Sequence, residues 1–554
     1  MKRMFVTALT LTLAFLFATS AAWAGGRQAG TAGAGSSAAY QRDPNLNAPG
    51  TFPINKQKVA LKVGIEQNPY VENWKTNWMT RRIEELGNYD LSFEVYPSGE
   101  MRQKLELMVM AGGADLPDIM LEGGLDLASI TKYGQAGMLI PTNTYYANSA
   151  YYIKESAKDL PVDPLKYVTS YDGNIYGLYG TTVSIYNQFS PARILIYEPW
   201  LQKLGLKLPE TVDEFVEVLR AFRDRDPNGN GLKDEIPLAG GRDNMNTNYL
   251  YALMSPFVFT QSNYWLLENG KVDVAYNKPG WREGLRFSKK LIDEGLLSSL
   301  SFTQDVNQLF AQISPDPPKV GAFLGTSASR LGANDPKRGQ YVCLPPLQGP
   351  AGRQAFWNPP IPTIQMVITK NCKTPESAFM LGDLLGSEEW SITTRYGEKG
   401  VDWVEPPAGA KSLFEHLGYK ATLQETGTLR WGTLQNKYWA EAGPQIRGNK
   451  HAGMDVDRND PFDFIGPIAR NLGPWIQYAN RTPVLGLVYN DAEQMVMNDR
   501  FSTILSYVQE SFARFAMGDL SIDRDWDSYV AEFSKMGLTD VIKVTQSAWD
   551  RMNK

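Results

Sequence analysis

The chain has 554 residues, of which 43% are hydrophobic and 21% are charged, a composition typical of a folded protein with enough length for two or more hydrophobic cores. Its formal net charge of -5 offers no broad basic surface, which argues against nucleic acid as a partner. The chain has two histidines, His416 and His451, which argues against a histidine-ligated zinc site and against a Ser-His-Asp triad.

Residues 1–24 have the pattern of a secretory signal peptide. Lys2 and Arg3 precede a mostly apolar run, Ala8–Ala18, and Ala22-Trp23-Ala24 matches an A-x-A cleavage site. The run is too short to anchor the chain in a membrane, and no later stretch approaches about 20 apolar residues. No cysteine stands near the cleavage site to carry a lipid. We therefore expect a free periplasmic protein whose residues 25–55, rich in Gly, Ala, Ser and Pro, form a flexible linker.

Strands alternate with helices from residue 59 to residue 121, which predicts an α/β fold with a parallel, doubly wound sheet. The expected elements are strand Val59–Ile65, helix Asn73–Leu86, strand Leu91–Tyr96, helix Met101–Met110 and strand Leu116–Leu121. Ligands bind such sheets outside the carboxyl ends of the strands. This rule nominates two segments for ligand binding, residues 67–74 and residues 122–124.

Residues 226–237 place oxygen-bearing groups at alternate positions of a glycine-containing turn, as in a loop that surrounds a hard cation. The candidate ligands are Asp226, Asn228, Asn230, the carbonyl of Leu232, Asp234 and Glu235. This set suits the six to eight oxygens that calcium takes, and magnesium fits it less well. An EF-hand sensor is disfavoured, because Pro237 stands where its closing glutamate belongs. We expect a structural calcium ion, and the alternative is an Asn/Gly-rich turn that binds nothing.

The helix before this loop has a clear start. Thr211 and Glu214 form a capping box, and the residues that follow place an apolar stripe on one helix face. That stripe consists of Phe215, Val218, Leu219 and Phe222. Further on, we expect helix Trp281–Ile292, strand Val320–Gly325, strand Ile364–Thr369 and helix Ser377–Leu385. Cys343 and Cys372 fit either a disulfide or two buried thiols, because their separation in space cannot be read from sequence.

Several segments resemble the extracellular solute-binding proteins of ABC importers, and in particular the subfamily of alginate-oligosaccharide binders and binding lipoproteins. The likeness is carried first by residues 200–206, Pro209-Glu210-Thr211, the helix from Asp213 and the loop 226–237. The chain departs from the family at Tyr197-Glu198-Pro199-Trp200, where the family has Arg-x-Asp-Trp. The likeness also includes residues 133–137, 172–178 and 341–347, the segment Arg395–Trp403, and the tail segments 518–519, 526–530 and 546–551.

The resemblance implies a type II periplasmic-binding-protein fold, with two lobes that each contain a sheet flanked by helices. A hinge would join the lobes, and the ligand would lie in the cleft between them. The expected N-terminal lobe comprises residues 56–190 and 345–400, and the C-terminal lobe comprises residues 191–344 and 401–554. In the family the loop matching 226–237 holds one calcium ion, through the same six positions. The implied partner is the permease of an ABC importer, and we expect a monomer.

A saccharide or oligosaccharide is the expected solute, since sugars need aromatic faces for their C–H surfaces and planar amides or carboxylates for their hydroxyls. Aromatic residues make up 12% of the chain, with 14 Trp. The candidate ligand-binding residues are Tyr70, Trp74, Glu122, Tyr186, Asn246, Trp357, Asn358 and Trp403. For any single aromatic residue, a place in the core is the competing interpretation.

Two other functions remain open at this point. A binding protein could take a peptide or another polar solute, and a secreted carbohydrate-active enzyme could share the same composition. A glycosidase would need two carboxylates facing each other across a cleft, about 5 to 10 Å apart. No motif proposes such a pair, so we expect a non-catalytic receptor that presents its solute to the permease.

Overall fold

The computed structural model describes residues 40–121, 124–182, 193–242, 249–355, 358–415, 418–427, 429–447, 460–471, 473–478 and 484–553. The chain divides into two compact units, Met1–Arg42 and Asp43–Lys554, and every element named below belongs to the second. The predicted signal peptide lies outside the described residues. Along the described part of the chain, no helix combines the length and the apolar character needed to cross a membrane.

Within the described residues, the larger sheet has six strands in the order β14-β4-β11-β3-β1-β2. The strands are β1 (Val59–Glu66), β2 (Tyr89–Tyr96), β3 (Ile119–Leu121), β4 (Leu178–Thr182), β11 (Thr363–Ile368) and β14 (Ile446–Arg447). β1 runs parallel to both β2 and β3, whereas β11 runs antiparallel to β3 and to β4. The sheet is therefore mixed, and the prediction of a parallel sheet was wrong at β11.

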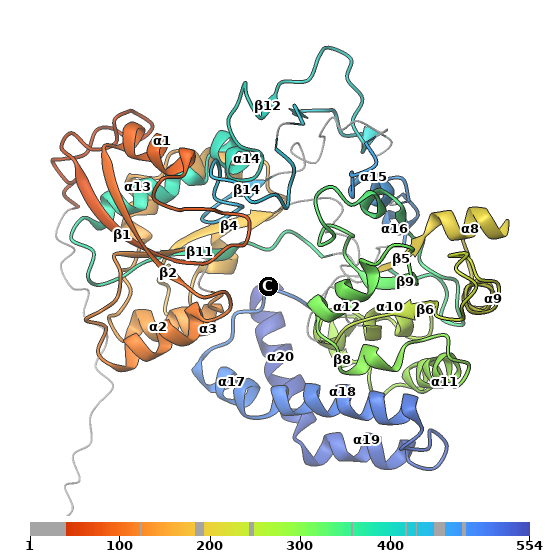
Figure 1. Ribbon diagram of the computed structural model, residues 1–554. Helices are drawn as coiled ribbons and strands as arrows, with labels where there is room; N and C mark the ends of the chain where they lie inside the picture. The colour runs from red at the N-terminus through yellow and green to blue at the C-terminus, as the bar shows by residue number, and fades with distance from the viewer. Residues whose placement is uncertain are drawn as a thin grey trace, which may run out of the picture. The chain divides into compact units, whose positions relative to one another are not determined.

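Helices cover both faces of this sheet. They are α1 (Trp78–Gly87), α2 (Met101–Met110), α3 (Leu127–Gln135), α4 (Asn143–Asn148), α5 (Tyr152–Ala157), α6 (Leu165–Val168), α13 (Pro375–Leu385) and α14 (Glu388–Tyr396). Because neighbouring strand residues point to opposite faces, Ile119 and Leu121 enter one core while Met120 enters another. Figure 1 shows α1 and α13 on one side of the sheet and α2 and α3 on the other. We call this sheet with its helices the first lobe.

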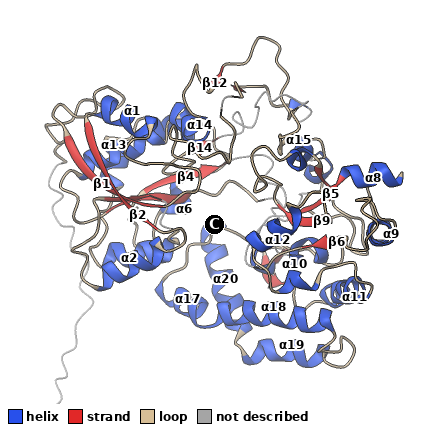
Figure 2. Ribbon diagram, viewed as in Figure 1, coloured by secondary structure: helices blue, strands red, loops and turns tan. Residues whose placement is uncertain are grey.

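A second sheet has the order β10-β5-β9-β6. Its strands are β5 (Arg193–Tyr197), β6 (Ile236–Ala239), β9 (Val320–Gly325) and β10 (Tyr341–Cys343). β6 runs parallel to β9, and β5 runs antiparallel to both β9 and β10. The sheet and the helices around it form a separate hydrophobic core, which we call the second lobe (Figure 2).

The second lobe carries most of the remaining elements. Its helices are α8 (Glu198–Leu204), α9 (Val212–Asp224), α10 (Tyr249–Met254), α11 (Pro279–Asp293), α12 (Val306–Ile313), α15 (Gly466–Ala469), α16 (Gly473–Ile476), α17 (Asp491–Val496), α18 (Ser502–Met517), α19 (Trp526–Lys535) and α20 (Leu538–Asn553). Two short ribbons are β7 (Trp265–Glu268) with β8 (Lys271–Val274), and β12 (Trp403–Val404) with β13 (Gln424–Glu425). Single turns are η1 (Ser262–Tyr264), η2 (Ser299–Phe302) and η3 (Pro336–Gly339), and the π-helical η6 (Met497–Phe501) joins α17 to α18.

The predicted helix start at Thr211 is confirmed. The Glu214 amide donates to Thr211 Oγ1 at 3.1 Å, and the Thr211 amide donates back to the Glu214 carboxylate at 3.1 Å. The four residues of the expected apolar stripe are all buried in the second core. The start expected at Asn73 was wrong, because Asn77 caps α1 through a 3.0 Å bond from the Met79 amide and the chain before it is not helical.

Two predicted boundaries also need correction. Residues 43–55 do not behave as a linker, since Leu46 and Ile54 are 4% and 3% exposed and pack into the first core. The C-terminal lobe was expected to include all of 401–554, yet Tyr438 and Trp439 lie in the first core and β14 extends the first sheet. Both cysteines are buried free thiols, with Cys343 in the second core and Cys372 in the first.

Candidate functional site

Tyr70 follows β1 at the carboxyl edge of the first sheet. It lies in the segment 67–74, which we expected to bind ligand because ligands bind outside the carboxyl ends of strands. Its half-buried ring meets the ring of Trp431 edge-on, with 5.5 Å between centroids. Gln435 fixes the backbone there, because its main-chain amide and its Nε2 donate to the Tyr70 carbonyl at 3.0 and 2.9 Å. Two segments 361 positions apart thus build one aromatic corner, which we call the Tyr70–Trp431 corner.

Trp431 packs against the hydrophobic cores of both lobes. Tyr438 of the first core stacks on it, with centroids 6.3 Å apart and planes at 11°. From the second lobe, the Arg338 guanidinium donates two hydrogen bonds to the Trp431 carbonyl, at 3.3 and 3.2 Å. Trp431 therefore lies where the two lobes meet, and small-molecule sites occur preferentially at such interfaces between domains.

Arg395, at the end of α14, lies over the ring of Trp431. Its guanidinium carbon is 4.2 Å from the centroid of the Trp431 ring, within the range of a cation–π contact. Arg395 also forms an ion pair with Glu441 at 2.5 Å, and Arg447 pairs with the same carboxylate. A planar ring, a planar guanidinium and the shared Glu441 carboxylate are groups of the kinds that recognise sugar rings and hydroxyls.

The carboxylates around this corner have perturbed acidities. Burial raises the pKa of Glu425 in β13 to about 7, although Arg395 and Arg430 oppose the shift. Burial alone would raise the pKa of Glu441, but the positive charges of Arg447 and Arg395 have a larger effect in the other direction. The pKa of Glu441 therefore lies below its ordinary value. Near neutral pH, Glu425 therefore exchanges its proton.

Two of the predicted aromatic ligand residues lie in hydrophobic cores. Trp74 is 5% exposed and packs on Phe93 and Trp439, with centroid distances of 6.1 and 6.2 Å. Trp403 is 3% exposed, and its Nε1 donates to the Gly397 carbonyl at 3.0 Å. Their burial favours the competing interpretation that these rings hold the fold together. Asn358 is half-buried, and Glu122, Tyr186, Asn246 and Trp357 lie outside the described residues.

The sequence analysis named Tyr70 as a candidate and did not name Trp431, the ring that it contacts. No strand, helix or motif marks the stretch around Trp431, so its place follows only from three-dimensional contacts. Arg395 carried a usable signal, since it begins the segment 395–403 that in the resembling family borders the cleft.

The loop between α9 and β6 folds tightly around Asp226, whose φ is 46°. One Asp226 oxygen accepts from the Gly229 amide at 2.8 Å and the Asn230 amide at 3.1 Å, and the other accepts from the Gly231 amide at 3.0 Å. Asn228 and Asn230 both donate their side-chain amides to Asp234, at 3.2 and 3.0 Å. Four of the six predicted ligands, Asp226, Asn228, Asn230 and Asp234, are thus joined by these hydrogen bonds.

Charge in this loop is only partly compensated. Lys319 contacts Asp234 at 2.6 Å and, with the amide of Asn230, lowers the pKa of Asp234 to about 2. Within the described part of the chain, both Glu235 oxygens are buried and make no hydrogen bond of ordinary geometry. Burial and, to a smaller extent, the charges of Asp226 and Asp234 raise the pKa of Glu235, and the nearby backbone amides of Glu235 and Asn228 oppose this shift. A buried carboxylate beside two further carboxylates is the arrangement expected at a cation site.

The carboxylates do not converge in this arrangement. Across the described residues, no group of three or more His, Cys, Asp and Glu side chains is arranged to hold a metal ion. A cation here would depend on the amide and carbonyl oxygens as well, and on turning Asp226 and Asp234 away from their present partners. The donor set suits calcium by its chemistry, since all six groups are oxygens.

Comparison with known proteins places the chain among binding proteins. Residues 65–391 match the family model described as Bacterial extracellular solute-binding protein. The fructooligosaccharide ABC transporter substrate-binding protein FusA of Streptococcus pneumoniae is 25% identical over 523 residues, which covers 90% of this chain and 92% of FusA.

Solved structures show the same two-lobed fold. FusA in complex with kestose has a TM-score of 0.73 at 22% identity, and the match covers 89% of this chain and 99% of FusA. A FusA structure with a mutated EF-hand has a TM-score of 0.72 at the same identity and coverage. The alginate-binding protein AlgQ2 without its calcium ion has a TM-score of 0.65 at 18% identity, over 91% of this chain and 100% of AlgQ2. Since the family model spans more than half of its length, the chain belongs to the family of bacterial extracellular solute-binding proteins.

Proposed function

We propose that the protein is the substrate-binding component of an ABC importer, and that it captures an oligosaccharide between its two lobes for delivery to the membrane permease. The observation that carries this proposal is the Tyr70–Trp431 corner, which joins an aromatic surface to a stacked arginine where both lobes contribute contacts. Similarity to FusA along nearly the whole chain supports the same solute class.

In this proposal, the exposed parts of the Tyr70 and Trp431 rings supply apolar surface for the C–H faces of sugar rings. Arg395, which is 7% exposed and paired with Glu441, holds the Trp431 ring in place. Closure of the lobes on the sugar would replace its water partners with these protein groups. Asn358 and the predicted residues outside the described part of the chain, Glu122, Tyr186, Asn246 and Trp357, remain candidate contacts. The protein binds its solute without cleaving it, acts as a monomer in the periplasm, and is exported by the signal peptide at residues 1–24.

Isothermal titration calorimetry against a panel of oligosaccharides tests this function. The panel should contain neutral fructans, milk-type oligosaccharides and acidic uronate oligomers, with short peptides as a second solute class. At least one saccharide should bind with a stoichiometry of one, and chromatography should recover it intact. Binding of peptides without saccharides, or release of shorter sugars, would exclude the proposed function.

We further propose that the loop 226–237 binds one calcium ion that stabilises the second lobe. The support is the oxygen donor set, the buried Glu235 carboxylate, and neighbours of the same fold whose solved forms include an EF-hand mutant and a calcium-free state. Asp226, Asn228, Asn230, Leu232, Asp234 and Glu235 would hold the ion. When bound, calcium supplies a fixed positive charge, and the chain's own residues link α9 to β6 around it.

A further inference from the structure

Trp431 belongs to a tight turn that contacts both lobes. The turn spans residues 430–433 and is closed by a 3.1 Å hydrogen bond from its last amide to its first carbonyl. The chain that follows is bonded to the first lobe, since the Glu72 amide donates to the Gln435 carbonyl at 2.9 Å. We call residues 430–433 the Trp431 turn, and its other contacts come from the second lobe.

Two arginines hold the Trp431 turn to the second lobe. Arg338, in η3, donates to the Trp431 carbonyl through both of its terminal nitrogens. The guanidinium carbon of Arg338 also lies 4.9 Å from the centroid of Phe464, a ring of the second core. Arg430, inside the turn, forms an ion pair with Asp460 at 2.5 Å. The second lobe therefore fixes the backbone of a residue whose ring packs against Tyr70 and Tyr438 of the first lobe.

Arg338 is 2% exposed, and across the described residues its hydrogen bonds both go to the Trp431 carbonyl. Burial lowers its pKa, and the nearby carboxylates of Asp460 and Asp463 oppose this shift from beyond ion-pair distance. The group stays charged, because an arginine does not lose its proton in a protein. Leaving a buried charged donor without an acceptor costs more than leaving a neutral one. The Trp431 backbone is therefore held in place by a contact that is costly to break.

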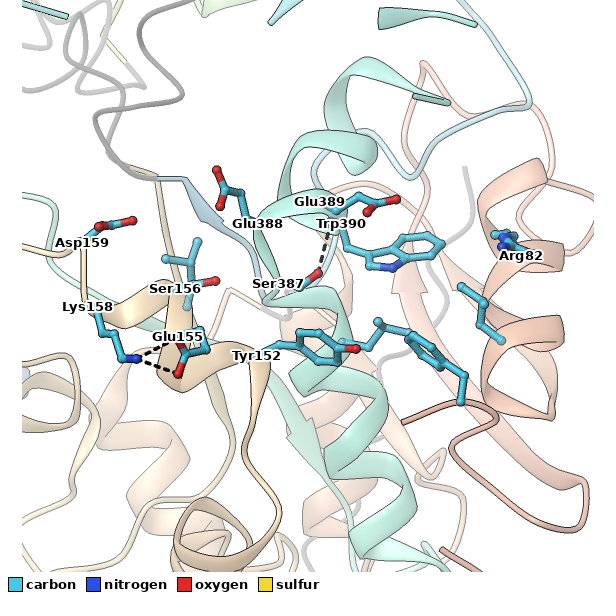
Figure 3. A pocket seen from close by; sticks show the side chains of 14 residues that line it. Arg82, Tyr152, Glu155, Ser156, Lys158, Asp159, Ser387, Glu388, Glu389 and Trp390 are labelled. Atoms are coloured by element: carbon cyan, nitrogen blue, oxygen red, sulfur yellow. Dashed lines mark hydrogen bonds and ion pairs between the residues drawn. The ribbon is translucent and has the colours of Figure 1, made fainter. Parts of the chain in front are cut away.

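A separate cavity of about 730 Å³ lies beside α5 and the start of α14, and neither Tyr70 nor Trp431 lines it (Figure 3). Its lining includes Glu389 and Trp390 from the first turn of α14, whereas Arg395 at the end of that helix lies over the Trp431 ring. A substitution in this cavity therefore alters the first lobe and leaves the contacts of the Trp431 turn in place.

We propose that Arg338 is a positioning residue of the oligosaccharide site, which holds the Trp431 ring against Tyr70 through the Trp431 carbonyl. This inference rests on the proposed function. Because Arg338 is almost completely buried, it acts on the sugar only through Trp431 and does not touch the sugar itself. The second lobe thereby sets the place of a ring that packs on the first lobe, and the sugar meets a surface that is already formed.

Arg338→Met tests this role, because methionine keeps an unbranched apolar stem beside Phe464 and removes the donors to the Trp431 carbonyl. Replacing a buried charged group by an apolar side chain of similar volume often leaves stability unchanged or higher, so the variant should fold. In calorimetry with a saccharide that the wild type binds, Arg338→Met should weaken binding about tenfold, or by about 1.4 kcal/mol. In a Trp431→Ala background, the same substitution should change the affinity less than about twofold, because the ring that Arg338 positions is gone.

Lys337→Met is the matched control. Lys337 is the neighbouring residue of η3, is also buried, and forms its ion pair with Asp335 at 3.0 Å. This variant, and Glu389→Gln in the separate cavity, should bind the saccharide as the wild type does. Circular dichroism of each variant verifies that the chain is folded, so that a lost signal reports on the site.

Hydrogen exchange of the sugar-free protein gives a second measurement. The amide of Thr433, which closes the Trp431 turn, should exchange faster in Arg338→Met than in Lys337→Met and the wild type. Unchanged exchange at this amide, unchanged saccharide affinity of Arg338→Met, or an equal loss with and without Trp431 would overturn this inference and leave the proposed function standing. A wild-type protein that binds no saccharide would refute the proposed function, and this inference with it.

Discussion

Glu235→Gln should change stability in opposite directions with and without calcium. In the absence of metal, the Glu235 carboxylate is buried, makes no hydrogen bond of ordinary geometry to the residues that the structure describes, and lies near the charges of Asp226 and Asp234. A neutral amide of the same shape removes the repulsion, so the metal-free variant should be more stable than the wild type by about 1 kcal/mol.

With calcium present the order should reverse. An ion that binds only the folded state stabilises it by about 2.7 kcal/mol when its free concentration is 100 times its dissociation constant. Losing one charged ligand weakens that affinity, so the variant should give up most of this stabilisation at the same calcium concentration. The two effects have opposite signs, which a general folding defect cannot produce.

The assay is chemical denaturation of wild type and variant, in EDTA and in calcium, after metal analysis has established the calcium content of the wild type. Glu510→Gln, an exposed substitution on α18, is the control and should behave as wild type in both conditions. If calcium stabilises the Glu235 variant as much as the wild type, Glu235 does not bind the ion. If calcium stabilises neither protein, the loop binds none and the Asn/Gly-rich turn is the better interpretation.

Three further predictions concern the site and the fold. Trp431→Ala should weaken oligosaccharide binding by about 1 to 3 kcal/mol in calorimetry, and Trp431→Phe should retain most of the affinity, because the sugar contacts a ring surface. Equal affinity of the wild type and both variants would show that Trp431 is not part of the site. The pKa of Glu425 rises to about 7 on folding, so the folded state holds a proton that the unfolded state releases, and this group's contribution to stability falls as pH rises from about 4.5 to 7. Glu425→Gln should therefore be more stable than wild type at pH 8, by at most about 3 kcal/mol, and should match it at pH 4; a difference that does not vary with pH would contradict this. Ile54→Ala should cost about 2 to 5 kcal/mol in the free energy of unfolding and Gln57→Ala should cost little, which separates a packed segment from a linker.

Local sequence patterns predicted individual elements well. α2 and β9 begin and end as expected, at Met101–Met110 and Val320–Gly325, because apolar spacing and flanking glycines report on local structure. The capping box at Thr211 is formed, since its partners are three residues apart. Such signals need no knowledge of the rest of the chain.

Long-range features could not be read in this way. The direction of β11 depends on how the chain returns from the second lobe, and a buried apolar run has the same pattern in either direction. Leu46 and Ile54 share a core with residues of α13, more than 300 positions away, while the surrounding composition is that of a linker. The Tyr70–Trp431 corner likewise joins segments that share no local pattern.

The aromatic candidates show the same limit. A tryptophan that packs in a core and one that contacts a sugar look alike in sequence, and Trp74 and Trp403 both proved to be buried. What separates them from Trp431 is contact with both lobes at once, which is a property of the folded chain.

Calorimetric titration of the purified protein with an oligosaccharide panel, followed by chromatography of the recovered sugar, addresses the central claim most directly. Saturable binding of at least one oligosaccharide at one site per chain, with the sugar recovered unchanged, is the predicted result. Recovery of cleaved sugar, or binding confined to peptides, would contradict it.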